Sequence, residues 1–149
     1  MTAYLADTSI WAWARREPVL AEKLARRLGG GSVATCVPVA LELLHSTRDV
    51  AEYERLLARL RRLEWVPPAV EAAREALGLQ RSLAATTHGA HRMPAVDYLV
   101  AGIAGAAVQD VVVWHADRDL RRLCEHAGIP HEVEEVGNDG TGGSGQPGR

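Results

Sequence analysis

Short apolar runs alternate with longer amphipathic stretches over the first 136 residues of the chain. The runs have the length of strands, and the stretches repeat their apolar positions with the three- to four-residue spacing of helices. Four strands are predicted at 2–6, 32–35, 65–66 and 111–114, and an edge strand is expected at 132–136. Helices are predicted at 8–16, 19–28, 38–46, 50–63, 70–83, 94–108 and 120–127.

This alternation predicts an α/β fold, a three-layer αβα sandwich around a central, mostly parallel sheet of four to five strands. The strand at 111–114 is apolar without interruption, as expected of a parallel strand that helices cover on both faces. Pro38 suits the first turn of a helix. The helix at 94–108 carries small residues, which we expect to allow close packing on the sheet. These are Ala101, Gly102, Ala104 and Gly105.

The composition changes after residue 136. Residues 137–149 are rich in glycine and nearly free of apolar groups, so we expect a disordered tail after one domain at 1–136. No apolar run approaches the roughly 20 residues of a membrane helix, and the start of the chain does not resemble a signal peptide, so we expect a cytoplasmic protein. Cys36 and Cys124 are too few for a disulfide framework and are expected to be buried thiols.

Four acidic residues far apart in the sequence are predicted to reach one edge of the sheet. Asp7 directly follows the first strand, and Asp117 follows the fourth. Asp97 stands in the first turn of the helix before the fourth strand, and Glu42 lies about 6 Å into the helix after the second. Ligands of such folds bind beyond the carboxyl ends of the strands, where the strand order reverses. These four acids therefore form the candidate catalytic site.

Each acid taken alone also has a structural interpretation. Asp7 and Asp117 could cap the helices that follow them. Asp97 could interact favourably with the dipole of its helix at the first turn, and Glu42 could be a solvated surface residue. Carboxylates gathered at one edge, however, raise one another's pKa unless a cation compensates. Their hard oxygen atoms suit Mg²⁺ or Mn²⁺. We therefore expect a site for one or two such ions, which would clamp a phosphate and activate a water.

The charge of the chain does not by itself indicate a nucleic-acid partner. The net charge is −2, whereas nucleic-acid binders are usually basic. All but one of the 17 basic residues are arginines, the exception being Lys23. Arginine has the planar fork that suits phosphate, but a GC-rich coding sequence would produce the same preference.

The motifs around the four acids resemble those of PIN-domain nucleases. Asp7-Thr8-Ser9 after the first strand resembles the opening of that family, and Glu42 within VPVALELLHS resembles its second acid. PAVD at 94–97 resembles the third acid, and VVVWHADRDL at 111–120 resembles the strand followed by a fourth, Asp117. The resemblance covers residues 1–136 and is carried by all four motifs occurring in order.

The length of the chain is also similar to that of the VapC-type toxins of bacterial toxin–antitoxin pairs. That resemblance implies Mg²⁺- or Mn²⁺-dependent cleavage of RNA by the four acids, formation of a homodimer, and inhibition by a small cognate antitoxin. Ser9 and Asp119 are expected to support the site. His115 stands where the family usually has Thr or Ser, so it either contacts metal or substrate or shapes the loop before Asp117.

Two other functions compete with this one for a chain of this size and pattern. A phosphoacceptor signalling domain needs a lysine after a late strand, and Lys23 lies in an early predicted helix, which argues against that function. A catalytically weak domain of the same fold that only binds RNA or protein is the alternative, although all four acids are present.

Overall fold

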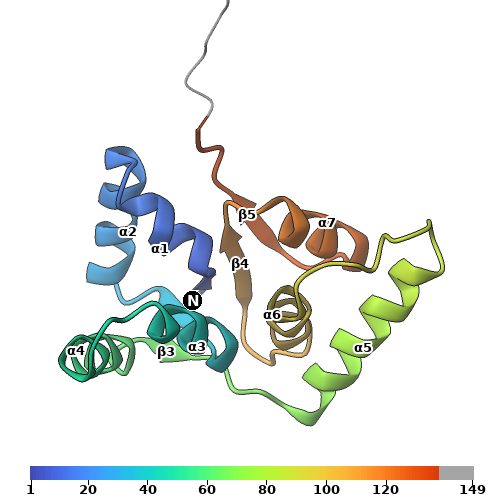
Figure 1. Ribbon diagram of the computed structural model, residues 1–149, viewed down its shortest axis with the longest axis horizontal. Helices are drawn as coiled ribbons and strands as arrows, with labels where there is room; N and C mark the ends of the chain where they lie inside the picture. Colours follow the sequence, from blue (N-terminus) through green and yellow to red (C-terminus); the bar gives the residue numbers. More distant parts are fainter. Residues whose placement is uncertain (138–149) are drawn as a thin grey trace, which may run out of the picture.

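Residues 1–137, which the computed structural model describes, form a five-stranded sheet with helices on both faces (Figure 1). The strands are β1 (Ala3–Ala6), β2 (Val33–Thr35), β3 (Glu64–Trp65), β4 (Val111–His115) and β5 (His131–Val133). The helices are α1 (Thr8–Ala14), α2 (Pro18–Gly29), α3 (Val37–His45), α4 (Val50–Leu60), α5 (Val70–Ala84), α6 (Ala95–Gly105) and α7 (Arg118–Ala127). Apart from Gly137, the predicted tail at 137–149 lies outside the described residues.

The sheet is parallel throughout, and its strands run in the order β3-β2-β1-β4-β5. From β1 the chain moves outward through β2 to β3, then crosses to β4 on the other side of β1 and ends on β5. The strand order therefore reverses between β1 and β4, where Ala6 lies opposite Trp114. This arrangement confirms the α/β sandwich that the alternation of strands and helices predicts.

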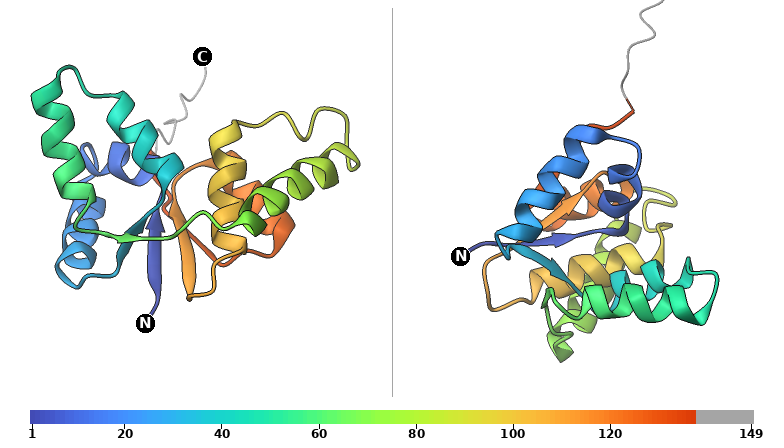
Figure 2. Two further views of the ribbon diagram at one scale, coloured as in Figure 1. Left: turned by 90° about the horizontal axis from the view of Figure 1, so that it is seen from below. Right: turned by 90° about the vertical axis from the view of Figure 1, so that its left-hand side faces the viewer.

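Two clusters of buried side chains hold the sheet between its helices. Because successive side chains of a strand point to opposite faces, Leu5 packs with residues of α5, α6 and α7, whereas Ala6 packs with α1 and α2. Ile10 and Trp114 are fully buried in the second cluster. Figure 2 shows α1 and α2 on one side of the sheet and α5 and α6 on the other. Burial on both faces accounts for the uninterrupted apolar character of β4.

Both cysteines are buried free thiols, as predicted. Burial raises the pKa of Cys36 to about 11 and that of Cys124 to about 12. At neutral pH both groups therefore stay protonated and act as small apolar side chains rather than as nucleophiles.

Two predicted helices end earlier than their apolar spacing indicates. The helix predicted at 94–108 stops at Gly105, and Val108 is fully exposed. The helix predicted at 50–63 stops at Leu60 because the next residues tighten into a turn, in which the Leu63 N–H donates to the Leu60 carbonyl at 3.0 Å. In both places apolar residues continue a helical pattern into the loop that leads to the next strand.

The small residues of α6 include one whose partner differs from the prediction. A Cβ at Gly102 would lie 2.4 Å from the Ala72 carbonyl oxygen and 3.0 Å from the Ala76 Cβ. Gly102 therefore lies against α5 and not against the sheet. The spacing of small residues predicts close packing, but it does not say which neighbour approaches.

No helix within residues 1–137 combines the length and the apolar character that crossing a lipid bilayer requires.

Candidate active site

The four predicted acids all lie on elements that meet at the carboxyl edge of the sheet, beside the reversal of strand order. Asp7 leaves β1 and caps α1, and Asp117 leaves β4 and caps α7. Asp97 stands in the first turn of α6 and Glu42 in α3, which begins directly after β2. The capping interpretations of Asp7 and Asp117 are thus correct, and they place the same two carboxylates at this edge.

Asp7 is held by its backbone and by Ser9. Its N–H donates to the Trp114 carbonyl at 2.9 Å, which fixes the residue at the end of the β1–β4 pair. Its Oδ2 accepts from the Ser9 N–H at 3.0 Å and from the Ser9 hydroxyl at 2.7 Å. The Ser9 Oγ in turn accepts from the Ala116 N–H at 2.9 Å. Ser9 therefore joins Asp7 to the segment that leads to Asp117, as a supporting residue would.

Asp97 is the most strongly perturbed carboxyl group of the site. It is 8% exposed, and its Oδ2 is buried without a hydrogen-bond partner among residues 1–137. Burial, followed by the charges of Asp117, Asp7, Asp119 and Glu42, raises the pKa of Asp97 to about 7. Burial also raises the pKa of Asp7, against the hydrogen bonds from Ser9 that lower it. A proton or a cation would relieve the unfavourable charge.

Asp117 and Asp119 form a tight group with Asp97. Asp117 Oδ1 accepts from the N–H groups of Asp119 and Leu120 at 2.8 and 2.9 Å, which fixes its carboxylate at the start of α7. Asp97, Asp117 and Asp119 each offer an oxygen atom, and these three atoms lie within 4.8 Å of one another. Asp119, which the sequence indicates only as a supporting residue, therefore belongs to this tight group.

Asp7 and Glu42 lie outside the tight group but near it. Each is close enough for its charge to raise the pKa of Asp97. Glu42 is exposed on α3, and its Oε2 accepts from the Thr8 hydroxyl at 2.6 Å. From the sequence, Thr8 is predicted only to begin a helix. Its hydroxyl directly follows Asp7, and this position at the same sheet edge is the signal that could have found it.

His115 shapes the loop before Asp117. The residue is fully buried, its Nδ1 accepts from the Asp117 N–H at 3.2 Å, and its ring stacks on His131 with centroids 5.6 Å apart. Burial and the neighbouring His131 lower the pKa of His115 to about 4, so the ring is neutral at physiological pH. Of the two interpretations that the sequence leaves open, these contacts favour the structural one.

The donor set fits a divalent cation of the Mg²⁺ type. All the candidate ligands are carboxylate oxygens, which hard cations prefer. The buried Asp97 Oδ2 without a partner, in a cluster of like charges, is a group whose charge a bound cation would satisfy. Burial, an oxygen without a hydrogen-bond partner and neighbouring like charges together distinguish this cluster from exposed acids that water solvates.

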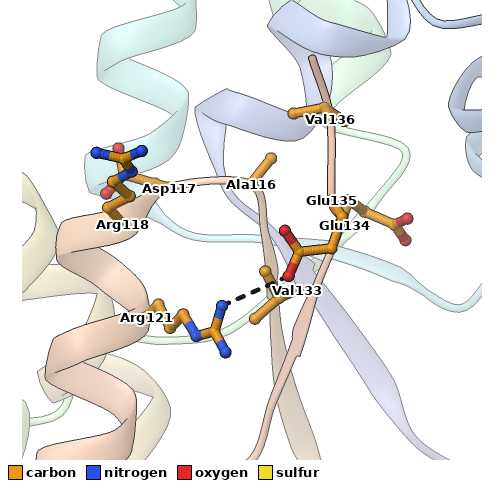
Figure 3. Close-up of a pocket in the computed structure, with 8 residues that line it drawn as sticks. All are labelled: Ala116, Asp117, Arg118, Arg121, Val133, Glu134, Glu135 and Val136. Carbon is orange, nitrogen blue, oxygen red and sulfur yellow. Dashed lines mark hydrogen bonds and ion pairs between the residues drawn. The ribbon is translucent and has the colours of Figure 1, made fainter. Parts of the chain in front are cut away.

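A pocket of about 350 Å³ opens beside Asp117 (Figure 3). Arg118 and Arg121 lie on the wall that α7 forms, and Glu134 and Glu135 lie on the opposite wall. Arg121 pairs with Glu125 at 2.9 Å and with Glu135 at 3.4 Å. Arg118 is exposed and makes no ion pair with any residue in the described range. Asp117 is the one acid of the cluster among the described residues that line this pocket, and the unpaired Arg118 guanidinium beside it is accessible to an anionic group.

Comparison with known proteins shows a family match over most of the chain. The family model described as PIN domain matches residues 4–126. Ribonuclease VapC18 of Mycobacterium tuberculosis is 31% identical over 129 residues, which are 87% of this chain and 93% of that protein. Ribonuclease VapC51 of the same organism is 31% identical over 127 residues, which are 85% and 89% of the two chains.

Solved structures share the fold at lower sequence identity. A chain of the DNA-bound VapBC from Salmonella typhimurium superposes with a TM-score of 0.66 at 21% identity and covers 89% of this chain and 98% of its own. A chain of VapBC2 from Rickettsia felis, bound to a DNA fragment from its promoter, gives a TM-score of 0.67 at 17% identity, with 91% and 100% covered.

Proposed function

This chain belongs to the PIN-domain family and, within it, to the VapC ribonucleases, and from this premise we propose that it is an endoribonuclease acting as the toxin of a toxin–antitoxin pair. The observation that carries the proposal is the acidic cluster at the reversal of strand order. Asp97, Asp117 and Asp119 offer oxygen atoms within 4.8 Å of one another, with Asp7 and Glu42 beside them. The relatives at 31% identity are named ribonucleases, which supports the same activity.

The proposal includes dependence on Mg²⁺ or Mn²⁺. Asp7, Asp97, Asp117 and Glu42 would hold the cation directly or through water, with Asp119 beside them. Such a cation supplies the Lewis acidity that activates a water for attack on phosphorus and neutralises charge on the leaving oxygen. When the water oxygen bonds to phosphorus and the bond to the 3′ oxygen breaks, the leaving oxygen takes a proton. The products are a 5′-phosphate and a 3′-hydroxyl.

The chain's own groups keep the acids in position during this reaction. Ser9 holds the Asp7 carboxylate, and two N–H groups at the start of α7 hold Asp117. Because these carboxylates are fixed before substrate arrives, little reorganisation is needed in the transition state. Arg118, exposed beside Asp117, is placed to contact a phosphate of the RNA.

The proposal also includes protein partners, a second copy of the chain and a cognate antitoxin. An apolar groove of about 570 Å³ adjoins Glu42, and Leu41 and Leu99 at its walls are 61% and 42% exposed. Exposed apolar patches of this kind are typical of protein interfaces. The solved structures that share the fold are VapBC complexes, which supports an antitoxin partner for this chain. Light scattering should give twice the chain mass, and the protein encoded by the neighbouring gene should co-purify; a monomer without a partner would contradict this part.

We propose the cytoplasm as the location, where RNA and a bacterial antitoxin would both be present. The lack of a helix able to cross a membrane among residues 1–137 supports this location. Fractionation of cells that express the chain tests the proposal, and recovery in the membrane fraction would contradict it.

Substitution Asp97→Asn tests the nuclease proposal. Asparagine keeps the shape of the side chain but removes the charge at the centre of the cluster. We expect RNA cleavage with Mg²⁺ or Mn²⁺ by the wild type and a rate at least about 100-fold lower for the variant. A 100-fold loss corresponds to about 3 kcal/mol of transition-state stabilisation. Arg74→Ala, on α5, is the matched control and should cleave RNA at the wild-type rate.

Equal cleavage by the wild type and Asp97→Asn would refute the assignment. If the wild type instead binds RNA but cleaves none with either ion, the alternative of a catalytically weak binding domain is correct.

A further inference from the structure

Glu42 differs from the other acids of the site in how it is held. Asp7 and Asp117 each accept hydrogen bonds from the backbone of the helix that they cap, and Asp97 is buried. Glu42 is exposed, and within residues 1–137 its side chain makes one hydrogen bond, from the Thr8 Oγ1 to its Oε2 at 2.6 Å. A glutamate has three rotatable bonds and loses substantial conformational entropy when it is ordered. Its position therefore depends on this one contact.

Thr8 is itself a rigid donor. It begins α1 directly after Asp7, whose N–H is bonded to the Trp114 carbonyl at 2.9 Å, so its backbone is tied to the end of the β1–β4 pair. Threonine is also branched at Cβ, which restricts its χ1 angle. The hydroxyl thus reaches from α1, which follows β1, to α3, which follows β2, and links the segment of Asp7 to that of Glu42. It occupies Oε2 of Glu42, and Oε1 has no hydrogen-bond partner in the described part of the chain.

We propose that Thr8 is a positioning residue of the cation site, which holds the Glu42 carboxylate at the acidic cluster through this hydrogen bond. The inference rests on the proposed metal-dependent function, because it assumes that Glu42 takes part in holding the cation. It assigns a role to a hydroxyl that is neither a ligand nor one of the acids. Groups that orient a ligand typically change metal affinity by about 10- to 100-fold when they are removed.

Calorimetric titration of the intact chain with Mn²⁺, without RNA, tests the inference. Thr8→Val removes the donor but keeps the branched shape, and Thr8→Ser keeps the donor. We expect Thr8→Val to weaken Mn²⁺ binding by about tenfold and Thr8→Ser to bind like the wild type. Glu42→Gln should also weaken binding, and adding Thr8→Val to Glu42→Gln should cause no further loss, because the two residues act as one unit.

Three results would overturn the inference: unchanged Mn²⁺ affinity in Thr8→Val, an affinity of Thr8→Ser as low as that of Thr8→Val, or a second full loss in the Thr8→Val, Glu42→Gln double variant. The melting temperature of each variant without metal shows whether the fold is intact. If Thr8→Val does not fold, Thr8→Ala compared with Thr8→Ser gives the same decision.

The same titration separates this inference from the nuclease proposal. A wild type that binds Mn²⁺ and cleaves no RNA refutes the nuclease, while the affinities of the Thr8 variants still decide the role of Thr8. A wild type that cleaves RNA, with Mn²⁺ affinity unaffected by Thr8→Val, refutes only the role of Thr8.

Discussion

Asp97 combines burial with the charges of four neighbouring carboxylates. Both effects oppose ionisation, and the pKa of its carboxyl group rises from the ordinary 3.8 to about 7. In the folded chain Asp97 therefore holds a proton over a pH range in which the unfolded chain has released it. Folding and proton binding are thus linked, and the stability of the protein without metal must depend on pH.

The sign of this dependence follows from the raised pKa. Between pH 3.8 and about 7 the folded state binds more protons than the unfolded state at this group, so the contribution of Asp97 to stability falls as the pH rises through that range. Above pH 7 the group is charged in both states and its contribution is constant. We therefore expect the free energy of unfolding of Asp97→Asn, minus that of the wild type, to rise by about 2 kcal/mol from pH 5 to pH 8.

Urea unfolding with a chelator present, at pH 5 and pH 8, measures this difference for the wild type and Asp97→Asn. Saturating Mg²⁺ at pH 8 should stabilise the wild type more than the variant, because a ligand that binds only the folded state adds to its stability. A stability difference that does not change with pH would show that Asp97 ionises normally.

At the scale of elements, α6 connects the site to the packing of the helix layer. Its first turn carries Asp97, and one turn further on Gly102 meets α5 so closely that a Cβ would lie 2.4 Å from the Ala72 carbonyl oxygen. A backbone atom cannot move aside as a flexible side chain can. The spacing of α5 and α6 therefore depends on the absence of a side chain at position 102.

Gly102→Ala should destabilise the protein by about 2 kcal/mol, because overpacking forces the two helices apart and outweighs the higher helix propensity of alanine. Gly78→Ala on α5 is the matched control. A Cβ there meets nothing within 4 Å, so this change should stabilise the chain by about 0.5 kcal/mol. Chemical denaturation of both variants measures the two effects. Equal effects at positions 78 and 102 would disprove the close contact.

At the scale of the whole molecule, the small net charge hides an uneven distribution of charged side chains. The net charge is −2, and five acidic side chains gather at the carboxyl edge of the sheet: Asp7, Glu42, Asp97, Asp117 and Asp119. An RNA strand that approaches this edge is repelled unless a cation and arginine side chains compensate. Arg118 lies at this edge, in the pocket beside Asp117, and it has no ion-pair partner among residues 1–137.

Arg118→Ala should therefore weaken RNA binding. It should also reduce the magnitude of the slope of log affinity against log salt concentration by about 1, the loss expected for one phosphate contact. Binding is best measured in the cleavage-deficient Asp97→Asn background, over a series of salt concentrations. Arg118→Lys, which keeps the charge, should retain most of the slope. Arg74→Ala removes the same charge from α5 and should leave the slope unchanged; a loss as large as that of Arg118→Ala would indicate a nonspecific effect of net charge.

The sequence by itself determined the order of strands and helices and the edge at which Asp7, Glu42, Asp97 and Asp117 lie. Apolar periodicity reports which side chains need burial, and in a parallel sheet every strand end and every following helix start falls on one edge. Helix ends were less predictable, since apolar residues such as Val108 continue a helical spacing outside a helix.

Only the tertiary structure decided which side chains touch. It placed Asp119 beside Asp97, joined Thr8 to Glu42, buried His115 as a neutral ring, and set Gly102 against α5. It also placed the Arg27 guanidinium 3.6 Å from the ring centroid of Tyr4 and paired it with Glu132, 105 residues later. Each contact joins groups through particular rotamers or across separate elements, and the spacing of residue types along one chain carries no information about either.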